Sequence, residues 1–270
     1  MNQEKIDKLR LNYLKEKKKE KQFILCIQLL ILISFIIFWE LSSRMLWIDP
    51  LLFSAPSSIW TLFIEKVSDF SIFPHIGVTV IETLISFGLG TLLGLGVAIL
   101  LWWFPKLAKI MDPYLVTLNA MPKTALGPII IVIFGTGMAS PIAMGIIICI
   151  IVTILVIYNA FQEVDENYLK VLRTFNASKL QIFNNAIFPA SLPTIISTLK
   201  VNVGLAWVGV IVGEFFVSQN GLGYLIVYSF QVFNFNLLLL SVIIILIIAA
   251  LMYVLVDTLE TFILKKLQRS

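Results

Sequence analysis

The sequence predicts an all-α integral membrane protein with six transmembrane helices, and its composition and hydropathy both point to this class. Of 270 residues, 59% are hydrophobic and 13% are charged, whereas soluble chains carry about 25% charged residues. The mean hydropathy is +0.96. A single span of about 20 residues would leave a mainly polar remainder. Several spans are therefore required, and no large soluble domain fits beside them.

Residues 1–22 form a basic segment that we expect to be a cytoplasmic tail. They hold eight lysine and arginine residues against four acidic ones, a composition that also suits contact with anionic lipid. The apolar run 22–39 that follows is just long enough to cross a bilayer. It lacks a clear small-residue cleavage site, so it is predicted to be an uncleaved first span rather than a signal peptide. The later stretch 57–67 is amphipathic enough to lie along the membrane interface.

Five further apolar runs are predicted to cross the membrane. They cover residues 76–103, 113–134, 138–158, 192–217 and 236–262. In the first of these, Gly90 and Gly94 have the spacing that lets two membrane helices approach closely. The run 113–134 is interrupted by Pro122 and Gly127, so its first half is predicted to be kinked or partly unwound.

The distribution of basic residues assigns the two sides of the membrane. With the N-terminus inside, 16 of the 20 basic residues fall on inner segments, as the positive-inside rule requires, and an odd number of spans would spoil this bias. Both termini are therefore expected in the cytoplasm, with residues 23–262 as the transmembrane domain and 263–270 as a second tail. This orientation explains the net charge of +4 without nucleic acid as a partner.

The segment 159–190 lies on the cytoplasmic side in this scheme and is the longest polar stretch in the central part of the chain. Its apolar residues recur with helical spacing in two groups separated at Asn176: Val164, Tyr168, Leu169, Leu172 and Phe175, then Leu180, Phe183 and Ile187. This predicts two short helices joined by a turn, because asparagine tolerates the left-handed conformation. Their apolar face either folds back on the bilayer surface or docks on a soluble partner.

Residues in and around this segment form a wider pattern. It consists of Val164-Asp165-Glu166, Arg173-Thr174, Ala177-Ser178, Phe183, Pro189-Ala190, Pro193, Gly204, Ala206-Trp207 and Glu214, with Pro122, Ala125, Leu126, Pro128, Phe134-Gly135 and Gly221-Leu222-Gly223-Tyr224 elsewhere. The pattern resembles the permease subunits of binding-protein-dependent ATP-binding-cassette (ABC) importers, in particular the subgroup that handles nitrate, sulfonates, taurine and thiamine precursors. The family signature itself, Glu-Ala-Ala, three residues, Gly, nine residues and Ile-x-Leu-Pro, is altered. At its positions stand Lys170-Val171-Leu172, Asn176, Ala186 and Phe188-Pro189, so only the proline is retained.

The resemblance implies the importer permease fold, with a cytoplasmic coupling helix-turn-helix, and a division of tasks between several proteins. Two permease copies, expected to form a homodimer, would build the pathway in the cell membrane. A separate ATPase would supply energy, and an extracytoplasmic binding protein would deliver a small solute such as a sulfonate, nitrate, taurine or a thiamine precursor. The ATPase would bind the ATP, because this chain has no Gly-x-x-x-x-Gly-Lys-Ser/Thr motif, and no cofactor is expected in the permease. The residues implied for ATPase coupling are Glu163, Asp165, Lys170, Leu172, Arg173, Phe175, Asn176, Ala177, Ser178, Phe183 and Pro189.

Polar residues inside the predicted spans are candidates for the translocation pathway. An ionisable side chain at membrane depth costs at least about 2.5–3.5 kcal/mol, so each needs a reason. The candidates are Glu82, Asn119, Lys123, Asn202, Trp207 and Glu214. Lys123 would attract an anionic solute, whereas the two glutamates would line a cavity or pair with a basic residue. The asparagines and the tryptophan are more typical of packing between helices. A further acid, Asp257, is expected to be neutralised by Lys265 or Lys266.

Two other function classes compete with the importer. An integral membrane enzyme is disfavoured, because the chain has one histidine and no zinc motif of the His-Glu-x-x-His type. Neither catalytic nor metal-binding residues are expected. The alternative that stays open is an ATP-independent channel or secondary transporter. Such transporters often contain inverted repeats with broken helices, and residues 76–134 and 192–262 show no convincing equivalence.

Overall fold

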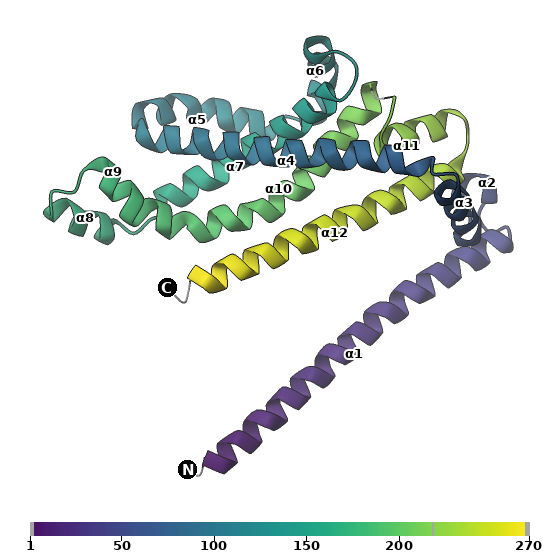
Figure 1. The fold of residues 1–270 in the computed structure, drawn as a ribbon, viewed down its shortest axis with the longest axis horizontal. Coiled ribbons are helices and arrows are strands. Elements are labelled where there is room, and N and C mark those ends of the chain that lie inside the picture. Colours follow the sequence, from purple (N-terminus) through teal and green to yellow (C-terminus); the bar gives the residue numbers. More distant parts are fainter. Residues whose placement is uncertain (1–2, 218, 268–270) are drawn as a thin grey trace. The chain divides into compact units, whose positions relative to one another are not determined.

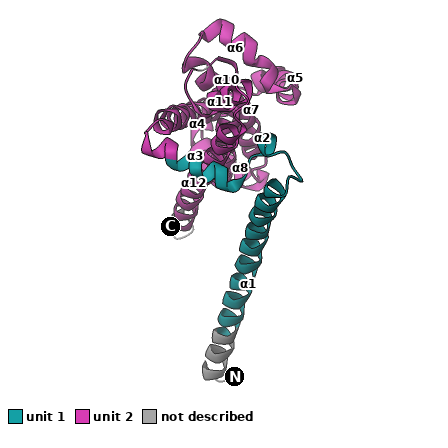
Figure 2. Ribbon diagram, turned by 90° about the vertical axis from the view of Figure 1, so that its right-hand side faces the viewer, with its two compact units in different colours: residues 1–64 teal, residues 65–270 magenta. Residues whose placement is uncertain are grey.

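A computed structural model describes residues 3–217 and 219–267, and every element in this part of the chain is a helix (Figure 1). It contains five helices that are long and apolar enough to cross a membrane, or six if one bent pair of helices is a single span. This confirms the predicted all-α membrane fold. The chain divides into two compact units, residues 1–64 and residues 65–270 (Figure 2).

In the first unit, one long helix is followed by two short ones. Helix α1 covers Gln3–Arg44, α2 covers Pro50–Phe53, and α3 (Pro56–Ser68) begins in this unit. The predicted basic tail is thus part of the same helix as the apolar run 22–39, because lysine and glutamate are good helix formers. Glu40 fixes the end of α1: its carboxylate pairs with Arg44 Nε at 2.6 Å and accepts hydrogen bonds from Ser57 N at 3.0 Å and Ser57 Oγ at 2.8 Å.

Three long helices form the centre of the second unit: α4 (Ile72–Trp103), α7 (Ala139–Gln162) and α10 (Phe188–Val217). Helix α7 packs against both of the others. A Cβ added at Gly94 of α4 would lie 2.5 Å from Thr153 Cβ of α7, and one at Gly209 of α10 would lie 2.5 Å from Gly145 Cα of α7. The close approach predicted from Gly90 and Gly94 is therefore confirmed, and α10 approaches α7 in the same way.

The predicted third span is broken. Helix α5 covers Pro105–Ala120, a 3-10 turn covers Lys123–Leu126, and α6 covers Gly127–Phe134. The two parts are bent by 97° at the break. Met121, which precedes Pro122, is extended (φ −69°, ψ 138°), as expected for the residue before a proline. The interruption was predicted, but the start at 113 was wrong, because Pro113 lies within α5 rather than at its beginning.

The segment 159–190 contains one separate short helix and one that joins the next span. Helix α8 covers Glu166–Thr174, and Asn176 has the predicted left-handed conformation (φ 52°). Helix α9 (Lys179–Ile182) continues through a π-helical turn, Phe183–Ile187, into α10, so that residues 179–217 form one helical stretch. The predicted second short helix is therefore not separate. The π turn directly precedes Pro189, which has no backbone N–H to donate, whereas Pro193 lies within α10.

The last two helices are α11 (Leu222–Gln231) and α12 (Phe235–Leu267). Helix α12 is fastened to α10 by ion pairs, since Lys200 Nζ lies 2.5 Å from Asp257 Oδ1 and 2.8 Å from Glu260 Oε2. The expected partner of Asp257 was Lys265 or Lys266. Among the described side chains its partner is instead Lys200, on another helix, and the side chain of Lys266 lies outside the described residues. Glu260 is buried and Asp257 is partly exposed, and a buried acid at membrane depth favours a basic partner within the bundle.

We predict that Gly209→Ala destabilises the second unit, whereas Gly204→Ala on the same helix does not. The added methyl group at position 209 meets the backbone of α7, while nothing lies within 4 Å of the Cβ position at 204. Overpacking of this kind costs about 1–3 kcal/mol. The measurement is heat-induced exposure of the buried Cys149 to a fluorogenic thiol reagent, in a Cys26→Ser background. Equal transition temperatures for the two variants would contradict the packing argument.

Candidate functional site

Two groups of residues lie at opposite ends of the second unit. Helices α8 and α9 lie at one end of the bundle and α11 at the other (Figure 1). We call these the α8 end and the α11 end. Neither group resembles a metal centre, because no three His, Cys, Asp or Glu side chains among the described residues are close enough to hold an ion.

Helix α8 presents apolar side chains to its surroundings. It begins where the Asp165 side chain accepts a hydrogen bond from Asn167 N at 2.8 Å, which satisfies one of the free N–H groups of the first turn. Tyr168, Val171 and Phe175 are exposed, with Tyr168 at 67% and Phe175 at 79%. Exposed aromatic and aliphatic residues on one short helix are the kind of surface that a helix-in-groove contact buries.

The opposite side of this segment is held by an aromatic cluster. Phe183 is 8% exposed, and its ring centroid lies 4.9 Å from that of Trp102 in α4 and 5.7 Å from that of Phe161 in α7. Lys179 Nζ donates to the carbonyl oxygen of Trp103 and lies 5.3 Å and 5.4 Å from the ring centroids of Trp102 and Trp103. Aromatic pairs and cation–π contacts each contribute beyond simple burial, so the α8 end is firmly attached to α4 and α7.

The residues predicted for coupling fall into three classes of exposure. Glu163, Asp165, Lys170, Arg173, Phe175, Asn176, Ser178 and Pro189 are exposed, and Leu172 and Ala177 are partly buried. Phe183 is a correction, because it is buried in the cluster and its ring cannot meet a partner protein. Lys179 and the two tryptophans were missed. Helical spacing identifies apolar faces, but it does not show which face packs against other helices of the same chain and which is left for a partner.

At the α11 end, three consecutive backbone N–H groups find side-chain acceptors. The N–H groups of residues 221, 222 and 223 donate to His75 Nδ1 at 3.1 Å, Thr79 Oγ1 at 2.8 Å and Glu214 Oε2 at 2.5 Å, respectively. Thr79 Oγ1 in turn donates to Glu214 Oε1 at 2.6 Å. Free N–H groups at a helix start favour a carboxylate, so Glu214 of α10 ties α11 to the bundle.

The glycines that start α11 are required by this contact. Gly221 has φ 113°, a conformation that side chains rarely adopt, and a Cβ there would collide with the carboxyl group of Glu214. A Cβ at Gly223 would lie 2.7 Å from Glu214 Oε2. The Gly-Leu-Gly sequence is therefore explained by the approach of the backbone to a buried carboxylate.

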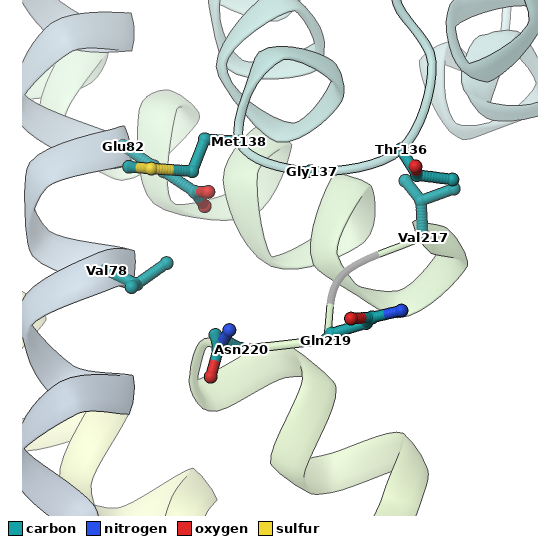
Figure 3. A pocket seen from close by; sticks show the side chains of 8 residues that line it. All are labelled: Val78, Glu82, Thr136, Gly137, Met138, Val217, Gln219 and Asn220. Carbon is teal, nitrogen blue, oxygen red and sulfur yellow. The ribbon is translucent and has the colours of Figure 1, made fainter.

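Beside this contact lies a cavity of about 250 Å³ with Glu82 in its wall (Figure 3). It is lined by Val78, Glu82, Thr136, Gly137, Met138, Val217, Gln219 and Asn220. Glu82 is 1% exposed and neighbours Glu214. The carboxyl group of Glu82 forms a hydrogen bond with that of Glu214, and no other donor among the described residues reaches its oxygens. Buried polar groups are normally paired, and here the two carboxyl groups are paired with each other.

The structure does not bring the six predicted pathway residues together. Glu82 and Glu214 are neighbours, and Asn119 and Lys123 form a second, separate pair. Asn202 is buried between helices, where its Nδ2 donates to Thr91 Oγ1 and Thr153 Oγ1, both at 2.8 Å. This is the packing role between helices that the sequence predicts as the alternative to a place in the pathway. Trp207 is buried as well. Asn119 lies at the break between α5 and α6, where its carbonyl oxygen accepts from Lys123 Nζ at 2.8 Å.

We predict that Glu214→Gln loosens the start of α11. The amide keeps one acceptor oxygen but loses the charge that strengthens the bonds from Thr79 and Gly223, a loss of about 1.5–3 kcal/mol for hydrogen bonds to charged groups. Hydrogen exchange at the Gly223 amide should then be roughly 10–100 times faster. The control is Glu65→Gln on the exposed side of α3. Unchanged protection at Gly223 would show that the carboxylate does not hold α11.

Comparisons with known proteins agree with this architecture. The family of binding-protein-dependent transport system inner membrane components matches residues 90–269. A probable ABC transporter permease of Haemophilus influenzae is 32% identical, over 68% of this chain and 75% of its own. The formylaminopyrimidine transport permease ThiX of Halalkalibacterium halodurans is 28% identical, over 72% of this chain and 77% of ThiX. SsuC of Bacillus subtilis, named for aliphatic sulfonate transport, is 26% identical, over 84% of this chain and 82% of SsuC.

A solved structure supports the fold. A chain of the methionine ABC transporter MetNI, in an inward-facing conformation, superposes with a TM-score of 0.61 at 17% identity, covering 75% of this chain and 98% of that one. The matched family consists of transport components rather than enzymes. The chain therefore belongs to the binding-protein-dependent transport system inner membrane components, and it is a transmembrane permease subunit of an ABC importer.

Proposed function

We propose that this permease pairs with a second copy of itself in the cell membrane and moves a small solute that an extracytoplasmic binding protein delivers. Both termini lie in the cytoplasm, and a separate ATPase docks on the exposed surface of α8 around Tyr168, Val171 and Phe175. The observation that carries the proposal is this surface, since apolar groups exposed on a helix too short to span a membrane favour a protein partner. The resemblance to importer permeases supports the pairing of two copies.

The charge distribution supports the proposed orientation. Lys170, Arg173 and Lys179 lie at the α8 end. The positive-inside rule then favours the cytoplasm for this end. The α11 end, with Glu214 and the cavity beside Glu82, faces the side from which a binding protein approaches.

The aromatic cluster supports a mechanical route from ATPase to pathway. A displacement of α8 and of the turn at Asn176 would be transmitted to Phe183 and Lys179. These two residues contact the ends of α4 and α7. These helices pack closely on each other along their length, so they move together rather than bend locally. Closure of the ATPase would then rotate the bundle as a rigid body between two conformations. Each conformation would be stabilised by the ATPase at the α8 end or by the binding protein at the α11 end.

The solute belongs to the small polar compounds that such importers handle. Relatives are named for formylaminopyrimidine and for aliphatic sulfonates. We propose that the solute of the present chain belongs to the same class, which includes sulfonates, nitrate, taurine and thiamine precursors.

We predict that Phe175→Asp reduces co-purification of the permease with its ATPase at least about tenfold, because a charge replaces an apolar contact at the centre of the docking surface. The matched control is Phe233→Asp, since Phe233 is 78% exposed and follows α11 at the opposite end of the bundle. Both substitutions remove an exposed ring, so neither should disturb the packed core.

Retention of the ATPase by Phe175→Asp, or equal loss in both variants, would refute the docking assignment. Phe183→Asp does not serve this test. Phe183 is buried against Trp102 and Phe161, and a charge there would disrupt the segment itself.

A further inference from the structure

We propose that a pocket behind α8 binds the headgroup of an anionic phospholipid, held by Lys109, Arg173 and Lys179. This pocket, which we call the α8 pocket, measures about 610 Å³ and is lined by residues of α4, α5, α7, α8 and α9. Helices α5, α8 and α9 lie at the same end of the bundle (Figure 1). The inference rests on the proposed function in one respect, because a lipid of the cytoplasmic leaflet reaches the pocket only if the α8 end faces the cytoplasm.

The α8 pocket carries an excess of positive charge. Lys109 of α5, Arg173 of α8 and Lys179 of α9 all line it, whereas Glu166 is the one acid among its described lining residues. This acid already has a partner, because Glu166 Oε2 lies 3.3 Å from Lys170 Nζ. Three cations around one space repel each other unless an anion lies between them. The pocket therefore favours an anionic guest.

The three cations keep donors for such a guest. Within the described part of the chain, the side chains of Lys109 and Arg173 take part in no hydrogen bond or ion pair. Lys179 Nζ is fixed by the carbonyl oxygen of Trp103 and by the rings of Trp102 and Trp103, which uses one of its three N–H donors. Arginine offers a planar fork that matches phosphate oxygens and lysine a compact charge, and hydrogen bonds between charged groups are the stronger class.

The rest of the wall is aromatic and aliphatic, which favours a lipid over a free inorganic anion. Trp102, Tyr158 and Phe161 contribute rings, and Leu169 and Ile182 contribute aliphatic groups. Basic pockets between membrane helices on the cytoplasmic side bind the headgroups of anionic lipids, and tryptophan collects where the membrane meets water. Inorganic phosphate would leave the apolar wall uncovered, whereas the glycerol backbone of a lipid would cover it. The volume suits a guest of this size.

The α8 pocket lies on the other side of α8 from the proposed ATPase surface. The two sets of residues are Glu166, Leu169 and Arg173 in the pocket, and Tyr168, Val171 and Phe175 outside it. Each set is spaced by three and four residues, and at about 3.6 residues per turn the two sets occupy opposite faces of the helix. The ATPase and a lipid can therefore bind α8 at the same time. A bound headgroup would connect α5, α8 and α9 behind the docking surface.

The experiment measures occupancy of the α8 pocket through a cysteine in its wall. Gln162→Cys, at an exposed lining position near the end of α7, is prepared in a Cys26→Ser background that keeps only the buried Cys149. The permease–ATPase complex is placed in nanodiscs of phosphatidylcholine with increasing fractions of phosphatidylglycerol. The thiol is then alkylated with iodoacetamide, which is uncharged.

A second cysteine corrects for the charge of the lipid surface, which changes the local proton concentration and hence the thiolate fraction. Asn167→Cys serves this purpose, because Asn167 is exposed on α8 but does not line the pocket. Each rate at position 162 is divided by the rate at position 167 in the same discs.

The proposal predicts that phosphatidylglycerol slows the normalised reaction at position 162 at least about fivefold, because bound lipid covers the cysteine. Lys109→Gln should raise the fraction of phosphatidylglycerol that gives half of this effect at least about fivefold, since one charge-assisted bond is lost. The matched control is Lys106→Gln, which removes the same charge from an exposed position of α5 outside the pocket. It should change that fraction less than about twofold. Free glycerol phosphate, added to discs of pure phosphatidylcholine, should give no protection.

Equal normalised rates in the two kinds of disc, or no reaction at position 162 in pure phosphatidylcholine, would overturn the proposal whether or not Lys109→Gln folds. Equal shifts for Lys109→Gln and Lys106→Gln would overturn it as well, because the lipid would then respond to the charge of the whole surface. Protection by glycerol phosphate would assign the pocket to a soluble phosphate and refute the lipid assignment.

These outcomes are separate from the test of the proposed function. Nanodiscs offer the same lipids to both ends of the bundle, so the protection at position 162 does not depend on the orientation in the cell. A pocket without lipid would leave the ATPase contact of α8 standing. Conversely, retention of the ATPase by Phe175→Asp would leave the protection at position 162 unchanged.

Discussion

The close packing of α7 between α4 and α10 is the constraint on which the rest of the second unit depends. In a bilayer, burial of apolar surface gives helices little reason to associate, so van der Waals contact and interhelical hydrogen bonds must hold them. Gly94 and Gly209 bring α4 and α10 to within contact distance of the α7 backbone. Asn202 then bridges Thr91 of α4 and Thr153 of α7. The result is a three-helix body whose members cannot slide independently.

Each end of this body carries a different kind of attachment. At the α8 end, Lys179 and Phe183 join the exposed short helix to α4 and α7 through aromatic rings. At the α11 end, Glu214 joins α11 to α10 through hydrogen bonds to backbone N–H groups. A rigid connection between two such ends fits a permease, because ATP is used on one side of the membrane and solute arrives on the other. Glu82, which pairs with Glu214, lies in the wall of a cavity at the α11 end.

Local features of the fold could be predicted from the sequence. The apolar runs indicated the helices, Gly90 and Gly94 indicated a close helix contact, and Pro122 indicated the break in the third span. Asn176 was expected in the left-handed conformation, and it is. Each of these depends on the chemistry of one or two neighbouring residues, which the sequence displays directly.

Features that depend on distant parts of the chain could not be predicted. Phe183 and Phe175 belong to the same apolar pattern, yet only one of them meets Trp102, which is far away in the sequence. Asp257 has two lysines nearby on its own helix but pairs with Lys200 on α10. The six polar candidates for the pathway shared one property, their depth in the predicted spans. Depth alone does not say which helix face a side chain occupies, and so it did not reveal that Asn202 is structural.

The central claim is that α8 and the Glu82 cavity face opposite sides of the membrane. It is tested most directly by a cysteine introduced at Tyr168 or at Phe233, in a Cys26→Ser background that keeps only the buried Cys149, and labelled with a membrane-impermeant maleimide. In right-side-out vesicles the account predicts labelling at position 233 and none at 168. In inside-out vesicles it predicts the reverse. Labelling of position 168 in right-side-out vesicles would contradict the account, because α8 would then lie beyond the reach of a cytoplasmic ATPase.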